Sequence, residues 1–264
     1  MSPSPNIITP AALLNRLDAI GEALRDSKHA LGLLGLGSVG IQPTWLDTHS
    51  DLDFFAIVEV GHKQRYIQQL DWLATAFPLA WSFQNTVDGH KALMVDGVFC
   101  EFAVFEPHEM IHIPYAPGRW VWRREDLRPE LAQPQVPLPS PQLPDETWIV
   151  GEALSCLFVG LQRWHRGEKL SAARLVQGHA LDRLIELDAL RARPEQTDMP
   201  ADFFSRERRL EYRQPSLLQE LPVLVPGYEH TQQAALAILA ELKKRHALLN
   251  ADIVSRIYQL ASAF

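Results

Sequence analysis

The sequence contains few cysteines, few basic residues and no long apolar run. Its 264 residues include two cysteines, Cys100 and Cys156, and both lie inside apolar segments, which argues against a disulfide framework and against a thiolate metal site. No window reaches the roughly 18 apolar residues that a membrane span needs, and the first twenty residues lack a basic stretch followed by an apolar core. We therefore expect a soluble, cytoplasmic protein with no membrane partner.

The shortage of positive charge falls mainly in the first half of the chain. The whole sequence has 25 basic and 32 acidic residues, for a net charge of −7. Residues 1–127 hold 9 Lys or Arg against 15 Asp or Glu, whereas residues 128–264 hold 16 against 17. Proteins that bind nucleic acid through its phosphates cluster Lys and Arg, so this balance argues against a nucleic-acid partner.

Proline is concentrated in one segment and suggests a domain boundary. Six of the nineteen prolines fall within residues 129–144, where fixed φ angles and missing N–H donors disfavour both helix and central strand. We expect an extended linker there. Before the linker, helical patterns alternate with β-rich runs at residues 31–37, 52–60, 79–84, 91–97 and 98–105. After it, apolar residues recur at helical spacing over residues 148–161, 170–190 and 234–260.

These patterns predict an α+β fold with two domains. The first, over residues 1–128, has a mixed sheet with flanking helices, and the second, over residues 145–264, is an all-α helical bundle. A chain of this length is large enough to bury a core in each.

The segment LGLLGLGSVGIQPTWLDTHSDLDFFAIVEV, residues 31–60, contains the residues that point most directly to a chemistry. Ser50 precedes a second predicted strand, which opens with Asp51, Leu52 and Asp53. Residues two apart in a strand project from one face, so the two aspartates present their carboxylates together while Leu52 faces the core. Paired carboxylates repel unless a cation lies between them, and Mg²⁺ prefers such oxygen ligands.

A glycine and a serine end the strand before this pair. Gly37 and Ser38 leave backbone N–H groups and a hydroxyl free to approach an anion such as a terminal phosphate. A third acidic residue, Glu101, stands in the middle of the apolar run at residues 98–104, where a charge without a partner would be costly to bury. Together these residues suit metal-assisted phosphoryl or nucleotidyl transfer.

The order of Gly-Ser, Asp-x-Asp and an acidic residue on a later strand resembles the core of the polymerase-β-like nucleotidyltransferases. The likeness extends to the lincosamide and aminoglycoside nucleotidyltransferases, in which a helical bundle follows the transferase domain. The segment LFVGLQRWHRGEKLSAARLV, residues 157–176, is similar to the first helical hairpin of that bundle. Many members carry a basic residue after Gly-Ser, whereas the loop at residues 37–43 contains no Arg or Lys.

This resemblance implies a two-metal mechanism with ATP or another nucleoside triphosphate as co-substrate. Asp51 and Asp53 would ligate the nucleotide-bound Mg²⁺, and Glu101 a second Mg²⁺ near the acceptor hydroxyl. The nucleotide's phosphates would lie against Gly37, Ser38 and Ser50.

The second half of the chain supplies the remaining candidates. Glu101 or Glu152 would remove the proton from the acceptor hydroxyl. Lys169 or Arg183 would meet the triphosphate, because the first domain has few bases of its own. The alternative for Arg183 is a solvated helix face with internal ion pairs, since it lies at helical spacing with His179, Asp182 and Glu186.

The sequence thus favours an Mg²⁺-dependent enzyme that moves a nucleotide, AMP from ATP, to a hydroxyl of a small molecule such as a lincosamide-like or aminoglycoside-like antibiotic. Such an enzyme would act in antibiotic resistance as a monomer or homodimer. Two alternatives stay open. One is a non-catalytic nucleotide-binding or antitoxin-like interaction protein, and the other is a transferase that acts on a protein or a tRNA acceptor.

Overall fold

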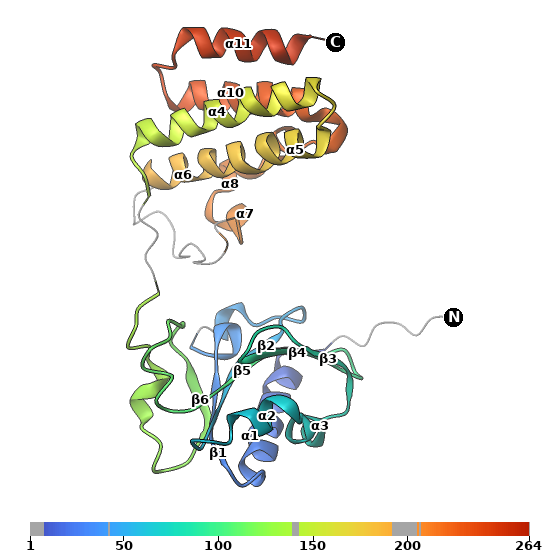
Figure 1. The fold of residues 1–264 in the computed structure, drawn as a ribbon, viewed down its shortest axis with the longest axis vertical. Coiled ribbons are helices and arrows are strands. Elements are labelled where there is room, and N and C mark those ends of the chain that lie inside the picture. The colour runs from blue at the N-terminus through green and yellow to red at the C-terminus, as the bar shows by residue number, and fades with distance from the viewer. Residues whose placement is uncertain (1–7, 42, 139–142, 192–204, 206, 264) are drawn as a thin grey trace, which may run out of the picture. The chain divides into compact units, whose positions relative to one another are not determined.

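The computed structural model describes residues 8–41, 43–138, 143–191, 205 and 207–263, and it separates into two compact units between residues 139 and 140 (Figure 1). The first unit contains all the strands of the described residues, and the second is helical. The predicted α+β fold class is therefore confirmed. No helix of the described residues is both long enough and apolar enough to cross a membrane.

A six-stranded mixed sheet forms the centre of the first unit. Its strands follow the order β3-β4-β5-β2-β1-β6; β2 and β5 are parallel, and the other neighbours are antiparallel. Each of the five predicted β-rich runs overlaps one strand, and β6 lies outside them. The bounds are β1 (Ala30–Gly35), β2 (Leu52–Val58), β3 (Leu79–Gln84), β4 (Gly89–Met94), β5 (Phe99–Phe105) and β6 (Arg119–Arg123).

Three helices cover one face of this sheet: α1 (Pro10–Asp26), α2 (Lys63–Gln68) and α3 (Asp71–Ala76) (Figure 1). The hydroxyl of Thr9 caps α1 by accepting from the N–H of Ala12 at 3.2 Å, and Pro10 takes the first helical position. Apolar residues at helical spacing in α1 then pack on alternate residues of the strands, such as Leu52 and Phe54.

The opposite face is covered only in part. There the segment after β5 packs over β1 and β2 through an apolar cluster that includes Met110, Tyr115, Leu127 and Leu131. The first residues of β2 and β5 contribute nothing to this cluster. The polar side chains at this end of the sheet are therefore not enclosed by it.

The proline-rich segment differs from the extended linker that its composition predicts. Residues 129–138 belong to the first unit and begin with a 3₁₀ turn, η3 (Pro129–Ala132). Pro129 takes the first position of the turn, where its missing N–H costs no hydrogen bond. Leu131 is buried, and the hydroxyl of Tyr115 donates to its carbonyl oxygen at 2.8 Å. Residues 139–142 lie outside the described residues.

The second unit is a bundle of helices around one apolar core. The side chain of Asp145 caps the long first helix by accepting from the N–H of Trp148 at 2.8 Å. The longer elements are α4 (Glu146–His165), α5 (Lys169–Ala173), a π-helical segment η4 (Arg174–Ala180), α6 (Leu181–Arg191), α10 (Thr231–Arg245) and α11 (Ala251–Ser262). Shorter turns are α7 (Leu210–Arg213), α8 (Pro215–Leu218), α9 (Leu221–Leu224) and η6 (Tyr228–His230).

The predicted helical segments are present with one division. Residues 234–260 form two helices, because the chain is extended at His246 and a new helix starts after Asn250. The side chain of Asn250 accepts hydrogen bonds from the N–H groups of Asp252 and Ile253. Apolar spacing alone does not show such a break, since both helices keep the same period.

Candidate functional site

Four side chains form a row across one face of the sheet in the first unit. Asp53 on β2 is the direct partner of Glu101 on β5, which is the partner of Lys91 on β4, which is the partner of Phe83 on β3. Directly paired residues of neighbouring strands leave the sheet on the same face. This face is the one opposite α1, because Leu52 and Phe54, on either side of Asp53, are buried against the helices.

Gly37 lies directly beside Asp53. It opens the 3₁₀ turn η1 (Gly37–Val39) with a positive φ of 53°, which favours glycine. A Cβ atom added there would lie 3.1 Å from Oδ2 of Asp53. The N–H of Leu36 also donates to the backbone oxygen of Asp53 at 2.8 Å. The turn that begins at Gly37 thus lies next to the side chain of Asp53.

Asp51 precedes the first residue of β2 and is partly buried. Burial raises the pKa of the nearby Cys100 thiol to about 12, Arg16 opposes the rise, and the carboxylates of Asp51 and Asp53 add to it. Both aspartates therefore lie close enough to act electrostatically on the same buried residue, which is the partner of Leu52.

The ligand atoms of Asp51, Asp53 and Glu101, the three predicted metal ligands, are not all close enough together to surround one ion. In the described part of the chain, the only group of three with ligand atoms within 4.8 Å of one another consists of His29, Glu59 and His62. Oε2 of Glu101 lies instead 3.0 Å from Nζ of Lys91. A donor set of three carboxylates still suits Mg²⁺, which prefers hard oxygen ligands and keeps several waters. In this structure the ammonium of Lys91 supplies the positive charge beside Glu101.

The histidine group lies at the other end of β1 and β2. Nδ1 of His29 is 2.9 Å from Oε2 of Glu59, and the other oxygen of Glu59 accepts from Arg124 at 2.7 Å. The rings of His29 and His62 are stacked 3.6 Å apart and nearly parallel, at 11°. A metal binds imidazole in the plane of the ring, so two parallel stacked rings do not point at one ion. We therefore assign no metal to this group.

The Gly-Ser loop has no basic residue of its own, but a basic side chain from β6 lies beside it. Ser38 lines a small cavity of about 230 Å³ together with Asp18 of α1 and Arg119 of β6. Arg119 is the partner of Gly35, and its Nη2 donates to the carbonyl oxygen of Val39 at 3.2 Å. Sequence reasoning missed Arg119 because no local pattern links residues 80 positions apart.

Ser50 has a structural role in the loop. Its Oγ accepts from the N–H of Asp47 at 3.0 Å and donates to a carboxylate oxygen of Asp47 at 3.2 Å. The N–H of His49 donates to the same carboxylate at 2.8 Å. These bonds close the loop that leads into β2, and the hydrogen bond from His49 holds the pKa of Asp47 below its usual value.

In the second unit, Arg183 is already paired. Its Nε lies 2.7 Å from Oε2 of Glu186, a buried carboxylate, and its guanidinium lies over the ring of Trp148 at 5.6 Å. This arrangement supports the alternative of an internal ion pair for this helix face. Glu152 lies partly buried on α4 and is not an exposed surface residue.

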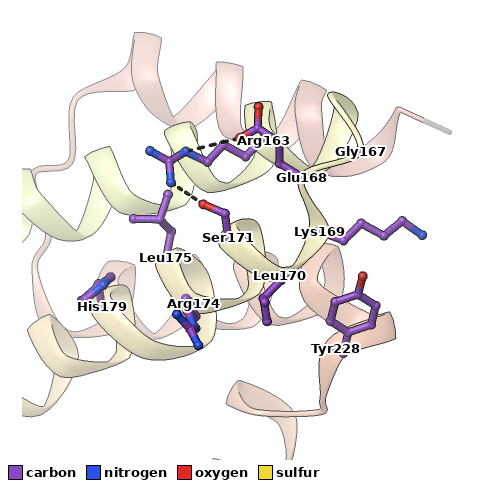
Figure 2. A pocket seen from close by; sticks show the side chains of 10 residues that line it. All are labelled: Arg163, Gly167, Glu168, Lys169, Leu170, Ser171, Arg174, Leu175, His179 and Tyr228. Atoms are coloured by element: carbon purple, nitrogen blue, oxygen red, sulfur yellow. Dashed lines mark hydrogen bonds and ion pairs between the residues drawn. The ribbon is translucent and has the colours of Figure 1, made fainter.

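Lys169 belongs to a cavity of about 560 Å³ at the hairpin between α4 and α5 (Figure 2). Its Nζ lies 4.7 Å from the centre of the Trp164 ring. The polar and aromatic lining residues include Arg163, Glu168, Lys169, Arg174, His179 and Tyr228. This cavity lies wholly inside the helical unit.

Comparisons with known proteins give little further information. No protein-family model matches the chain, and no curated protein sequence matches it either. Among solved structures, the chain aligns with the crystal structure of an aminoglycoside 6-adenyltransferase from Bacillus subtilis at 11% identity and a TM-score of 0.39. The alignment covers 95% of this chain and 98% of that one. Any functional assignment therefore rests on the residues described above.

Proposed function

We propose that the protein is a nucleotidyltransferase that uses Mg²⁺ and a nucleoside triphosphate, with ATP as the donor of AMP. The observation that carries the proposal is the position of Gly37 beside the carboxylate of Asp53, together with the direct pairing of Asp53 and Glu101. It places a turn suited to phosphate next to two carboxylates on one open face of the sheet. Carboxylates close together repel one another, and a cation bound between them would relieve that repulsion.

Asp51, Asp53 and Glu101 would hold the metal ions. Mg²⁺ held there would stabilise the charge on the attacking and leaving oxygens of the phosphoryl group. Asp51 and Asp53 would hold the nucleotide-bound ion, and Glu101 would hold a second ion near the acceptor hydroxyl. Lys91 would compete with the metal for one oxygen of Glu101, because Oε2 lies 3.0 Å from that ammonium.

Ser38 and Arg119 would position the phosphates. A hydroxyl, the backbone N–H groups of the turn and a guanidinium form a common set of donors for phosphate oxygens. Arg119 thus replaces the basic residue that the loop lacks. Ser50 remains a weaker candidate for phosphate binding, since its hydroxyl already bonds to Asp47.

The acceptor is proposed to be a small molecule with a free hydroxyl, such as a lincosamide-like or aminoglycoside-like compound. Glu101 or Glu152 would accept the hydroxyl proton. A nucleic-acid acceptor is disfavoured by the net charge of −7. Lys169 stays a candidate for contact with the phosphates of the nucleotide. Arg183 is disfavoured for this role because it forms an ion pair with Glu186.

The test is pyrophosphate release from ATP in the presence of Mg²⁺ and a panel of hydroxylated lincosamides and aminoglycosides. Asp53→Asn keeps the size of the side chain and removes its charge, so it should abolish release. Glu125→Gln, an exposed substitution in the same unit, is the matched control and should keep full activity. An Asp53→Asn protein as active as the wild type would refute the assignment. The absence of nucleotide binding in any condition would favour an interaction protein.

A further inference from the structure

We propose that the cavity between α4 and α5 binds an organic phosphate whose ring packs on the apolar wall of the cavity. This site lies in the helical unit and does not depend on the carboxylates of the sheet. Its volume of about 560 Å³ falls in the range of small-molecule sites, which is roughly 300–1,000 Å³.

The charge of the cavity favours an anion. Arg163, Lys169 and Arg174 line it, against one acidic residue, Glu168. The carboxylate of Glu168 already pairs with two guanidinium groups: its Oε1 lies 3.2 Å from Nε of Arg166, which does not line the cavity, and its Oε2 lies 4.0 Å from Nε of Arg163. The lining therefore carries uncompensated positive charge.

Two of the basic groups are available to a ligand. Arg163 is engaged, since its guanidinium donates to the hydroxyl of Ser171, as Figure 2 shows. In the described part of the chain, by contrast, Arg174 and His179 make no side-chain hydrogen bond or ion pair, and both are exposed. Arginine is well suited to phosphate because its planar donors match two oxygens at once.

The π-helical segment explains how Arg174 and His179 come to share one wall. These residues are five positions apart and mark the two ends of the cavity side of η4. In an α-helix, five residues turn the chain by about 140° past a full turn, so the two side chains would diverge. The i→i+5 hydrogen bonding of a π-helix brings residues five apart onto the same face. Such segments are rare in helices and are frequent at functional sites.

The remaining wall suits a ring. Leu170 and Tyr228 are exposed to 59% and 47%, large values for side chains of this kind, and Leu175 also lines the cavity. In Figure 2, Lys169 and Tyr228 lie on one side of Leu170, and Arg174 and His179 lie on the other. A ligand with an apolar ring and a phosphate group would contact both kinds of lining.

The experiment is isothermal titration of the full chain, in EDTA, with inorganic phosphate, phenyl phosphate and ATP. We expect phenyl phosphate to bind more tightly than inorganic phosphate. The double variant Lys169→Gln/Arg174→Gln should weaken phenyl phosphate at least tenfold, and Tyr228→Ala should weaken phenyl phosphate but not inorganic phosphate. Arg256→Gln, at an exposed arginine of α11 outside the cavity, is the control for loss of positive charge elsewhere on the same unit.

Comparison of the ligands in this titration also distinguishes a nucleotide from another organic phosphate. Tighter binding of ATP than of phenyl phosphate, weakened by the double variant, would identify the ligand of the cavity as a nucleotide. Tighter binding of phenyl phosphate would identify a separate organic phosphate, and ATP binding that the double variant leaves unchanged belongs to the first unit and does not count for the cavity. Asp53→Asn should leave the affinities for the two small phosphates unchanged. The proposal for the cavity and the proposal for the sheet site can therefore be refuted separately. Equal weakening by the double variant and by Arg256→Gln, or no binding of either small phosphate, would overturn the proposal.

Discussion

Asp53 and Glu101 occupy directly paired positions on the parallel strands β2 and β5, and their side chains leave the sheet on the same face. Parallel pairing places residues 48 positions apart within one strand spacing, about 4.8 Å. Lys91 continues the row on β4 and contacts Glu101, and Gly37 lies beside Asp53.

Lys91→Gln should strengthen binding of Mg²⁺. The ammonium lies 3.0 Å from Oε2 of Glu101 and competes with a metal for that oxygen. Because both side chains are about one-third exposed or more, the loss of the pair should change the free energy of unfolding by at most about 1 kcal/mol. A Mg²⁺ titration of nucleotide binding would measure the effect, with Lys28→Gln as the control. Weaker Mg²⁺ dependence in Lys91→Gln would show that the ammonium assists the site.

Arg119→Gln should weaken nucleotide binding about tenfold. The substitution removes the charged donor beside Ser38, and a charge-assisted hydrogen bond to phosphate contributes about 1.5–3 kcal/mol. The measurement is the dissociation constant of an ATP analogue in the presence of Mg²⁺. Arg128→Gln, an exposed change in the same unit, should have no effect. Identical affinities for the two variants would exclude Arg119 from the phosphate site.

Gly160→Ala should destabilise the helical unit by about 1–3 kcal/mol. A Cβ at this position would lie 2.7 Å from Cγ2 of Val176, because α4 packs closely on the π-helical segment. Gly151→Ala is the matched control on the same helix, since nothing lies within 4 Å of its added methyl group. It should be neutral or stabilise the helix by up to about 1 kcal/mol. Urea denaturation of both variants checks the difference, and equal stabilities would contradict the close packing.

Asp96→Asn should destabilise the first unit at neutral pH by about 2 kcal/mol. Burial tends to raise the pKa of Asp96, but hydrogen bonds from Arg16 outweigh it, so the pKa lies below its usual value. A lowered pKa gives stability that is fully present above the unfolded-state pKa of about 3.9 and is lost as the pH falls through the lower folded-state value.

The difference in free energy of unfolding between wild type and Asp96→Asn should therefore stay constant from pH 7 down to about pH 5 and shrink below about pH 4. Thermal unfolding across this range measures it. A gap that persists unchanged at pH 3 would mean that Asp96 contributes through packing and not through its charge.

The candidate acids can be proposed from the sequence because their signals are local. Alternation places Asp51 and Asp53 on one side of a strand, and an acid within an apolar strand identifies Glu101. Lys91 and Arg119 could not be found this way. Their positions beside Glu101 and Ser38 depend on which strands are neighbours and in what register, and each such pairing joins distant parts of the chain.

Two features of the fold could not be predicted from residue types and apolar spacing. Residues 129–138 read as a linker because proline disfavours regular structure, yet tertiary contacts of Leu131 and Tyr115 hold them against the sheet. The π-helical turn at residues 174–180 has the same apolar spacing as the α-helices around it, so residue types do not reveal it. In both cases packing decides the outcome.

The most direct test of the central claim is a calorimetric titration of the full chain with a non-hydrolysable ATP analogue, with and without Mg²⁺. The account predicts that Mg²⁺ strengthens binding in the wild type and in Glu125→Gln, and that Asp53→Asn and Glu101→Gln each remove this Mg²⁺ dependence. Affinity for the analogue that is the same with Mg²⁺ and with EDTA in the wild type would contradict the assignment of Asp53 and Glu101 as a metal and nucleotide site.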